Sequence, residues 1–170
     1  MKLENFIRSI PDFPKKGILF RDITPLLNNP KAFKASIDRM ASLLKNKKID
    51  VIVAAESRGF IFGGALAYKL KCGFVPVRKP GKLPYETYKI SYGLEYGRDS
   101  LEIHRDAFKK GAKVLILDDL LATGGTAKAL AKLVKKMGGK IIGVMFLIEL
   151  SALKGRKRLR NLPVYSLIKY

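Results

Sequence analysis

Residues 114–126 of the chain read Val-Leu-Ile-Leu-Asp-Asp-Leu-Leu-Ala-Thr-Gly-Gly-Thr, and this pattern predicts the fold class of the chain. Its apolar start, Val114–Leu117, is typical of a buried parallel strand. The small residues that follow end in a glycine pair, and from there apolar and lysine residues alternate at helical spacing. A strand that runs through a short loop into a helix is the building unit of α/β proteins.

The loop in this stretch is built to bind an anion. Backbone N–H groups in a glycine-containing turn and at a helix N-terminus point outward and carry partial positive charge. Glycine allows a close backbone approach and positive φ, while threonine adds hydroxyl donors. The loop differs from the nucleotide-triphosphate loop, because no lysine follows the glycines, and from the dinucleotide fingerprint. The predicted phosphate-binding residues are Ala122, Thr123, Gly124, Gly125 and Thr126.

Two carboxylates, Asp118 and Asp119, stand directly before this loop. Carboxylates beside a phosphate site would repel a simple phosphate ligand. They make chemical sense when the phosphate is attached to a polyol whose hydroxyls need acceptors. A ribose 5-phosphate has this character, so we predict that Asp118 and Asp119 bind the ribose hydroxyls, with room for a divalent cation. A pair of strand-end caps is the structural alternative.

The rest of the chain alternates strands and helices. Short apolar runs predict strands at 51–55, 73–78, 114–117, 140–148 and 164–168, and helical spacing predicts helices at 31–45 and 59–70 and after the glycine pair. This order predicts an α/β domain over residues 1–170, with a mostly parallel sheet flanked by helices. Residues 79–99 differ, because prolines and glycines punctuate polar residues and tyrosines. A segment of this kind is expected to be either a functional loop or hairpin, or a solvent-facing hairpin.

Composition limits the possible functions. The 170 residues include 34 Lys+Arg and 14 Asp+Glu, which gives a net charge of +20, and 48% are hydrophobic. No apolar run is long enough for a membrane span, the N-terminus lacks a signal core, and the single Cys72 excludes an internal disulfide. These features predict a cytoplasmic domain that does not bind membranes.

The positive charge gathers at two places. Lys128, Lys132, Lys135 and Lys136 share one helix face and are typical of a solvated surface. The cluster at 154–160 could contact nucleic-acid phosphates, but no aromatic residue lies among its cations for base stacking. We therefore expect nucleic-acid binding to be at most non-specific.

The Asp-Asp…Gly-Gly-Thr stretch resembles the signature of the type I phosphoribosyltransferases, which bind phosphoribosyl pyrophosphate. Further motifs resemble the adenine branch of that family in order and spacing, over nearly the whole chain. They are Phe-Arg-Asp-Ile-Thr-Pro at 20–25, Glu-Ser-Arg-Gly-Phe at 56–60, Arg-Lys-Pro-Gly-Lys at 78–82, Leu-Glu-Tyr-Gly at 94–97 and Leu-Ile-Glu-Leu at 147–150.

The resemblance implies a Rossmann-like fold and a pentosyltransferase that converts adenine and phosphoribosyl pyrophosphate into AMP and pyrophosphate in purine salvage. It also implies Mg²⁺ as cofactor and a homodimer. Residues 1–28 would form a hood over the base, and residues 79–99 a flexible catalytic loop.

Site residues follow from the same resemblance. The pyrophosphate-binding residues would be Ser57, Arg58, Gly59, Arg78, Lys79 and Lys82. In this family the loop at residue 57 often contains a cis peptide bond that does not involve proline. The adenine-binding residues would be Leu19, Phe20, Arg58 and Leu150. Glu95 would carry a proton to or from the adenine ring, and Tyr96 and Arg58 would complete the catalytic group. No protein side chain is assigned to the metal, because the substrate would hold most of it.

Two alternatives remain open from the sequence. The chain could transfer the phosphoribosyl group to another base, such as hypoxanthine, guanine, xanthine or orotate. It could instead be a regulator that senses phosphoribosyl pyrophosphate and binds nucleic acid, as the +20 charge allows. The intact Leu-Glu-Tyr-Gly motif favours an enzyme over the regulator.

Overall fold

A five-stranded parallel sheet forms the centre of the computed structural model, which describes residues 1–93 and 98–170. The strand order is β4-β3-β7-β8-β9, and every neighbouring pair is parallel. The strands are β3 (Val51–Ala55), β4 (Gly73–Val77), β7 (Lys113–Leu121), β8 (Lys140–Glu149) and β9 (Val164–Lys169). The predicted α/β class with a mostly parallel sheet is confirmed.

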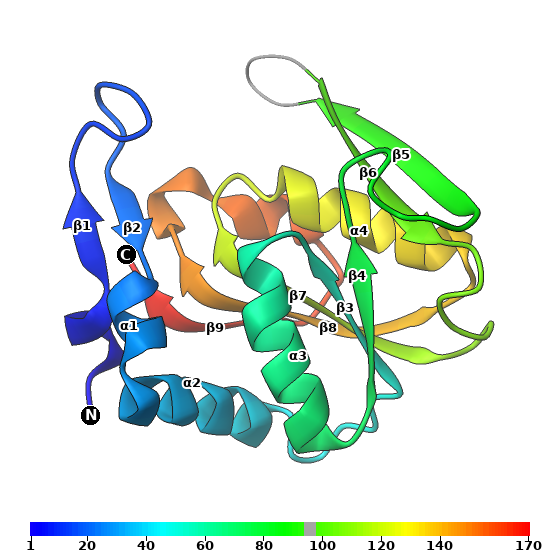
Figure 1. The fold of residues 1–170 in the computed structure, drawn as a ribbon, viewed down its shortest axis with the longest axis horizontal. Coiled ribbons are helices and arrows are strands. Elements are labelled where there is room, and N and C mark those ends of the chain that lie inside the picture. The colour runs from blue at the N-terminus through cyan, green and yellow to red at the C-terminus, as the bar shows by residue number, and fades with distance from the viewer. Residues whose placement is uncertain (94–97) are drawn as a thin grey trace.

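Helices cover both faces of this sheet (Figure 1). The helices are α1 (Thr24–Asn28), α2 (Pro30–Leu43), α3 (Arg58–Leu70) and α4 (Gly125–Lys136). Every residue of β3 is buried. Because side chains alternate along a strand, Val51 and Val53 pack in the same cluster as α4, while Ile52 packs with α2 and α3 on the other face.

The helices begin where local chemistry favours a start. At α2, Asn29 is the N-cap, its side chain accepts a hydrogen bond from the Ala32 N–H at 2.9 Å, and Pro30 occupies the first helical position. At α4, Gly124 is the N-cap with a φ of 84°, a left-handed conformation that glycine adopts readily. Both starts therefore agree with the sequence pattern.

Two antiparallel hairpins stand above the sheet, one on either side (Figure 1). The N-terminal pair is β1 (Arg8–Ile10) with β2 (Phe20–Asp22), and the other is β5 (Thr87–Gly93) with β6 (Arg98–His104). The described residues also form three short 3₁₀ helices: η1 (Leu3–Phe6), η2 (Ser151–Leu153) and η3 (Gly155–Leu159). The second hairpin means that much of segment 79–99 is strand.

The predicted elements match the observed ones closely, except that β7 continues to Leu121 instead of ending at Leu117. The lysines of α4 are exposed and its apolar face is buried, as expected. Among the described residues, no helix has the length and apolar character that crossing a membrane requires.

Candidate active site

The predicted phosphate loop connects β7 to α4 and encloses a small hollow. The hollow has a volume of about 70 Å³, and its lining includes all five predicted phosphate-binding residues, Ala122–Thr126, together with Asp118. The loop passes so close to η3 that a Cβ at Gly124 would lie 2.6 Å from the Gly155 carbonyl oxygen. Glycine at 124 is thus required both by its positive φ and by this contact.

The two aspartates lie at the end of β7 beside the first turn of α3. The Asp118 Oδ1 accepts a hydrogen bond from the Asp119 N–H at 2.9 Å, and the Asp119 Oδ2 lies 2.8 Å from the Arg58 Nε. Desolvation, followed by the neighbouring charge of Asp119, raises the pKa of Asp118 well above its usual range. Desolvation also raises the pKa of Asp119, against the opposing charge of Arg58. Hydroxyl donors or a cation would relieve this crowding of negative charge.

A larger cleft, of about 300 Å³, joins these groups to the second hairpin. The residues that line it are Ala55, Glu56, Ser57, Arg58, Lys79, Tyr92, Asp99, Leu101, Asp118, Asp119 and Thr126. The cleft therefore brings together predicted phosphate, ribose and pyrophosphate residues from three separate parts of the chain. The peptide bond between Glu56 and Ser57 at its edge is cis, as the resemblance led us to expect.

Glu56 contacts three of the predicted pyrophosphate-binding residues, Arg78, Lys79 and Lys82. Its Oε1 accepts the Lys79 backbone N–H at 2.6 Å, its Oε2 lies 3.2 Å from the Lys82 Nζ, and the Arg78 Nε is 3.5 Å from Oε1. Desolvation opposes the ionised form, but the hydrogen bonds from Lys79 and Lys82 keep the pKa of Glu56 below its usual range. The Arg78 Nε is buried and makes no hydrogen bond to the described residues. The contact between the Arg78 Nε and Glu56 is therefore an ion pair without a hydrogen bond.

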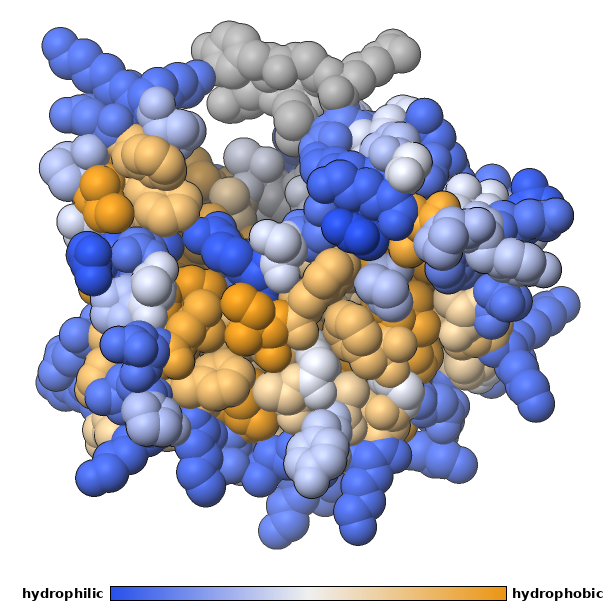
Figure 2. Space-filling view, in the orientation of Figure 1, coloured by the Kyte–Doolittle hydropathy of each residue, from blue (hydrophilic) through white to orange (hydrophobic). Residues whose placement is uncertain are grey.

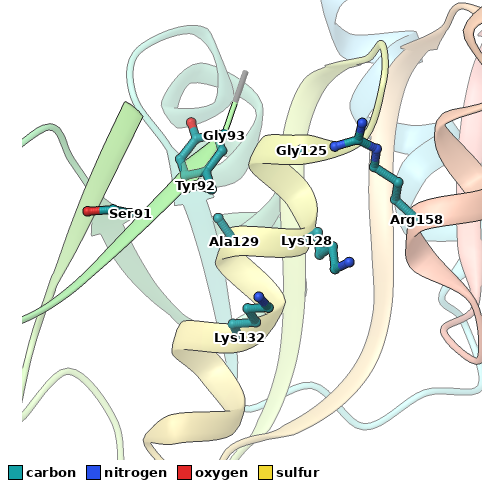
Figure 3. A pocket seen from close by; sticks show the side chains of 8 residues that line it. All are labelled: Ser91, Tyr92, Gly93, Gly125, Lys128, Ala129, Lys132 and Arg158. Carbon is teal, nitrogen blue, oxygen red and sulfur yellow. The ribbon is translucent and has the colours of Figure 1, made fainter. Parts of the chain in front are cut away.

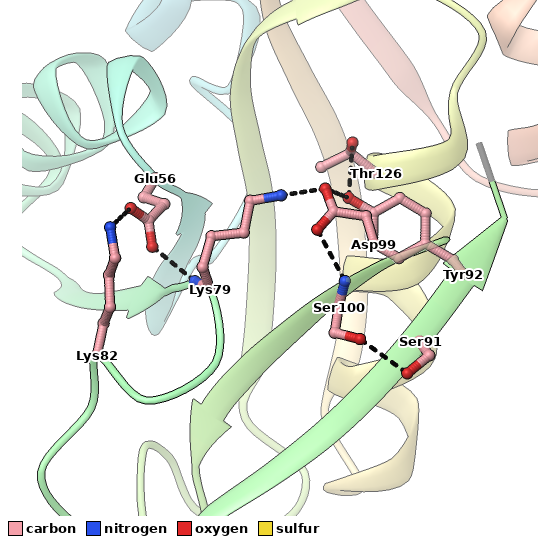
Figure 4. A network of polar contacts seen from close by, with 8 residues as sticks. All are labelled: Glu56, Lys79, Lys82, Ser91, Tyr92, Asp99, Ser100 and Thr126. Carbon is pink, nitrogen blue, oxygen red and sulfur yellow. Dashed lines mark hydrogen bonds and ion pairs between the residues drawn. The ribbon is translucent and has the colours of Figure 1, made fainter. Parts of the chain in front are cut away.

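Asp99 and Tyr92 also line the cleft, although the sequence did not single them out as site residues. The Asp99 carboxylate forms an ion pair with the Lys79 ammonium and accepts a hydrogen bond from the Tyr92 hydroxyl at 3.2 Å. The Tyr92 hydroxyl also lies 3.3 Å from the Thr126 Oγ1 in the phosphate loop (Figure 4). This chain of contacts connects the second hairpin to α4. Tyr92 and Asp99 are close because they are opposite each other in the register of β5 and β6.

The predicted base-binding residues lie around Arg58 and the end of β8. The Arg58 Cζ is 5.2 Å from the centre of the Phe20 ring, which meets the Phe13 ring edge-on at 5.0 Å. Leu19 beside it is 47% exposed. Leu150 is partly buried, and its N–H donates to the Leu121 carbonyl at 2.9 Å. The predicted catalytic residues Glu95 and Tyr96 lie outside the described residues.

A third hollow, of about 270 Å³, lies on the outer side of the phosphate loop. Ser91, Tyr92, Gly93, Gly125, Lys128, Ala129, Lys132 and Arg158 line it (Figure 3). The Arg158 guanidinium approaches Gly125, since a Cβ there would lie 3.8 Å from the Arg158 Nη1. These cations raise the positive potential beside the loop, which favours capture of phosphorylated ligands.

Comparison with known proteins agrees with this geometry. A family model described as "Phosphoribosyl transferase domain" matches residues 22–167. The adenine phosphoribosyltransferase of Thermotoga sp. (strain RQ2) is 62% identical over 170 residues, covering 100% of each chain. The chain belongs to the adenine phosphoribosyltransferase family.

Solved structures of this family superimpose closely on the chain. The adenine phosphoribosyltransferase of Thermoanaerobacter pseudethanolicus is 58% identical, with a TM-score of 0.97 over 99% of this chain and 98% of that one. The Saccharomyces cerevisiae enzyme, solved with an imino-altritol bisphosphate and adenine, is 45% identical, with a TM-score of 0.91 over 96% of this chain and 95% of that one. The chain is therefore an adenine phosphoribosyltransferase in family and fold, rather than a member of a branch specific for another base.

Proposed function

We propose that the chain transfers the phosphoribosyl group of phosphoribosyl pyrophosphate to adenine, which gives AMP and pyrophosphate. The observation that carries the proposal is the 300 Å³ cleft, in which a phosphate loop, a carboxylate pair and clustered cations meet. Each of these groups matches one part of the substrate: the 5′-phosphate, the ribose hydroxyls and the pyrophosphate. Family membership supports adenine as the base.

The 5′-phosphate binds the loop Ala122–Thr126, where backbone N–H groups and threonine hydroxyls donate to its oxygens. Asp118 and Asp119 accept hydrogen bonds from the ribose hydroxyls. The raised pKa values of both carboxyls support this role, because hydroxyl donors stabilise the ionised forms that desolvation disfavours. The sugar is thus held at two points, which fixes the anomeric carbon for attack.

Negative charge grows on the pyrophosphate as it leaves. Ser57, Arg58 and Gly59 bind the leaving group on one side, and Arg78, Lys79 and Lys82 stabilise its charge on the other. The clustering of Arg78, Lys79 and Lys82 around Glu56 supports this assignment. Preorganised cations in a site that excludes water are an effective means of stabilising a leaving group. In the free protein, Glu56 pairs with Arg78 and Lys82, and Asp99 pairs with Lys79.

Adenine binds against the apolar faces of Phe20 and Leu150, with the Leu19 backbone reading its exocyclic amine. The 5.2 Å approach of Arg58 to Phe20 supports a base subsite next to the ribose subsite. Glu95 exchanges a proton with the purine ring, and Tyr96 shapes the closed site. Replacing Glu95 with Gln lowers kcat far more than it weakens phosphoribosyl pyrophosphate binding; an unchanged kcat removes Glu95 from the mechanism.

Mg²⁺ is the proposed cofactor, and the donor set is compatible with it. Mg²⁺ prefers oxygen ligands and is commonly held by one or two carboxylates together with substrate phosphates. Asp118 and Asp119 offer such oxygens, and the described residues contain no cluster of three or more ligating side chains that would form a separate metal site. When bound, the ion neutralises charge on the pyrophosphate. The protein side chains orient the phosphoribosyl pyrophosphate.

The proposal includes the remaining organisation of the chain. Residues 1–28 form the hood over the base. Residues 79–99, which include β5 and the start of β6, act as the flexible catalytic segment that closes over the substrate. The enzyme acts in the cytoplasm as a homodimer, and its basic surface binds nucleic acid at most non-specifically. A groove between α2 and α3 is lined by Phe33, Ile37 and Tyr68 together with Lys34, Asp38 and Lys69. The apolar residues exposed on this face of the molecule (Figure 2) support pairing with a second copy. Light scattering at increasing protein concentration tests the dimer.

A panel of free bases tests the proposed function. The purified chain is incubated with phosphoribosyl pyrophosphate and adenine, hypoxanthine, guanine, xanthine or orotate, with and without Mg²⁺. Pyrophosphate release is expected with adenine and Mg²⁺. Turnover of another base at a higher kcat/KM contradicts the base assignment, and no turnover together with salt-dependent nucleic-acid retention favours the regulator.

A further inference from the structure

Arg156 and Glu149 form a two-point ion pair at the end of β8. The Arg156 Nε donates to the Glu149 Oε1 at 2.7 Å, and the Arg156 Nη2 donates to Oε2, also at 2.7 Å. Glu149 is only 6% exposed. The hydrogen bonds from Arg156 hold the pKa of Glu149 below its usual range, so the carboxylate is ionised at neutral pH. Such paired, parallel hydrogen bonds fix orientation as well as charge.

The same guanidinium reaches the neighbouring strand. Its Nη1 donates to the Val164 carbonyl at 2.9 Å, and its Nη2 lies 3.2 Å from the Ser166 Oγ. The Ser166 hydroxyl in turn donates to the Glu149 Oε2 at 2.6 Å. Arg156 therefore fastens the turn formed by residues 150–160 to two adjacent strands, although the sequence placed it in a basic cluster.

This turn touches the proposed substrate site at two points. At its start, the Leu150 N–H donates to the Leu121 carbonyl at 2.9 Å, directly before the phosphate loop. Further on, Gly155 packs against the loop itself, since a Cβ there would lie 2.3 Å from the Ala122 carbonyl oxygen. Gly155 is next in sequence to Arg156. The turn thus carries the proposed adenine wall and also supports one side of the proposed phosphate loop.

We propose that Arg156 is a positioning residue for both the adenine and the 5′-phosphate subsites, acting through Glu149 and the turn 150–160. The inference rests on the proposed function, because that function assigns Leu150 and the loop to the substrate. Arg156 itself does not contact either substrate. Glu149 neutralises the charge of Arg156. The contribution of Arg156 therefore comes from the planar guanidinium, which holds Glu149 by two parallel hydrogen bonds. Lysine has the same charge but cannot make the paired hydrogen bonds.

The experiment compares Arg156→Met, Arg156→Lys and Lys157→Met. Lys157→Met is the matched control, because it removes one positive charge from the same turn and the exposed Lys157 side chain forms no hydrogen bond or ion pair with the described residues. KM for adenine, KM for phosphoribosyl pyrophosphate, kcat and the Tm are measured for each. If Arg156→Met fails to fold, Glu149→Gln takes its place, because it removes the charge of the other partner of the ion pair.

We expect Arg156→Met to raise both KM values by on the order of tenfold, with a smaller fall in kcat. Both binding subsites shift in this variant, whereas the residues that act on the reacting atoms keep their positions. Arg156→Lys recovers less than half of the lost kcat/KM, and Lys157→Met stays within about twofold of the wild type. The inference is overturned if Arg156→Met folds with both KM values unchanged. It is also overturned if only one KM rises, or if lysine restores full activity.

A binding measurement separates failure of the inference from failure of the proposed function. Calorimetry with ribose 5-phosphate alone and with adenine alone needs no turnover. Weaker binding of both probes to Arg156→Met, but not to Lys157→Met, supports the positioning role even if the base panel shows another preferred base. Unchanged binding of both probes in a folded variant overturns it, whatever the activity of the wild type.

Discussion

The Arg58 guanidinium lies between the proposed ribose and base subsites, with its Nε 2.8 Å from the Asp119 Oδ2. Its Cζ lies 5.2 Å from the centre of the Phe20 ring on the opposite side. One side chain at the start of α3 thus links the end of β7 to the N-terminal hairpin. The planar guanidinium suits both contacts, since it forms directed hydrogen bonds and also stacks on aromatic rings.

Replacing Arg58 with Lys is expected to lower kcat/KM for adenine by on the order of 100-fold, because the ammonium keeps the charge but loses the contact with Phe20. Steady-state kinetics with both substrates measures the effect. Arg160→Lys, at an exposed position of the turn, is the control and should change kcat/KM by less than twofold. Full activity of Arg58→Lys would show that charge alone accounts for the contribution of Arg58.

Asp118→Asn is expected to abolish transfer while raising the stability of the free protein at neutral pH. The pKa of Asp118 is higher in the folded chain than in the unfolded chain. The folded state therefore binds more protons, and stability falls as pH rises from the unfolded pKa through the raised folded pKa. Asparagine removes this penalty and still accepts the Asp119 N–H. We expect the Tm at pH 7 to rise by about 2–4 °C, which corresponds to roughly 1 kcal/mol.

The pH dependence provides the check on Asp118. The Tm difference between Asp118→Asn and the wild type should shrink as the pH is lowered through the raised pKa, because wild-type Asp118 then becomes neutral too. Asp106→Asn, at an exposed position, is the control for the loss of one carboxylate and should leave the Tm at pH 7 within about 1 °C of the wild type. A lower Tm for Asp118→Asn at pH 7 would contradict the prediction.

Asp99→Asn is expected to strengthen pyrophosphate binding. In the structure, the Asp99 carboxylate pairs with the Lys79 ammonium, so it competes with an incoming anion for that cation. Removing the carboxylate charge should lower the Kd for pyrophosphate by about two- to fivefold, the range expected for a partly exposed ion pair. Calorimetric titration measures it. Glu86→Gln removes one negative charge from an exposed pair with Arg105 and should leave the Kd unchanged.

If Asp99→Asn binds pyrophosphate more weakly, Asp99 holds Lys79 in the binding orientation rather than competing for it. The Tyr92 hydroxyl then becomes the next position to test, because it joins Asp99 to the phosphate loop. Tyr92→Phe keeps the ring and removes only these two contacts.

Local chemistry explains which features the sequence could predict. The phosphate loop and the aspartate pair are contiguous, so their residue types and spacing reveal them. The last part of β7 was missed because Asp118 and Asp119 interrupt the apolar run, although the strand continues and Leu121 pairs with Glu149. Sequence patterns report burial, and a strand that enters a polar site loses that signal.

Contacts between distant residues could not be predicted in the same way. Asp99 is twenty positions from Lys79 and reaches it only through the hairpin register. Arg156 belongs to the basic cluster at 154–160, which the sequence suggested could contact nucleic-acid phosphates. Its guanidinium instead pairs with Glu149 at the end of β8. Each of these contacts depends on tertiary packing, which no local spacing encodes.

Gly124→Ala is expected to disable the phosphate loop and destabilise the fold, whereas Gly64→Ala should not. Gly124 has a φ of 84°, and a Cβ there would lie 2.6 Å from the Gly155 carbonyl oxygen. Gly64 lies inside α3 with open space around a Cβ. Alanine at 64 should stabilise the chain by about 0.5–1 kcal/mol, because alanine favours helix more than glycine does. Alanine at 124 should lower stability by about 1–3 kcal/mol and raise KM for phosphoribosyl pyrophosphate at least tenfold. Thermal unfolding and steady-state kinetics on both variants test the pair, and a Gly124→Ala enzyme with wild-type KM would show that the phosphate does not bind against this turn.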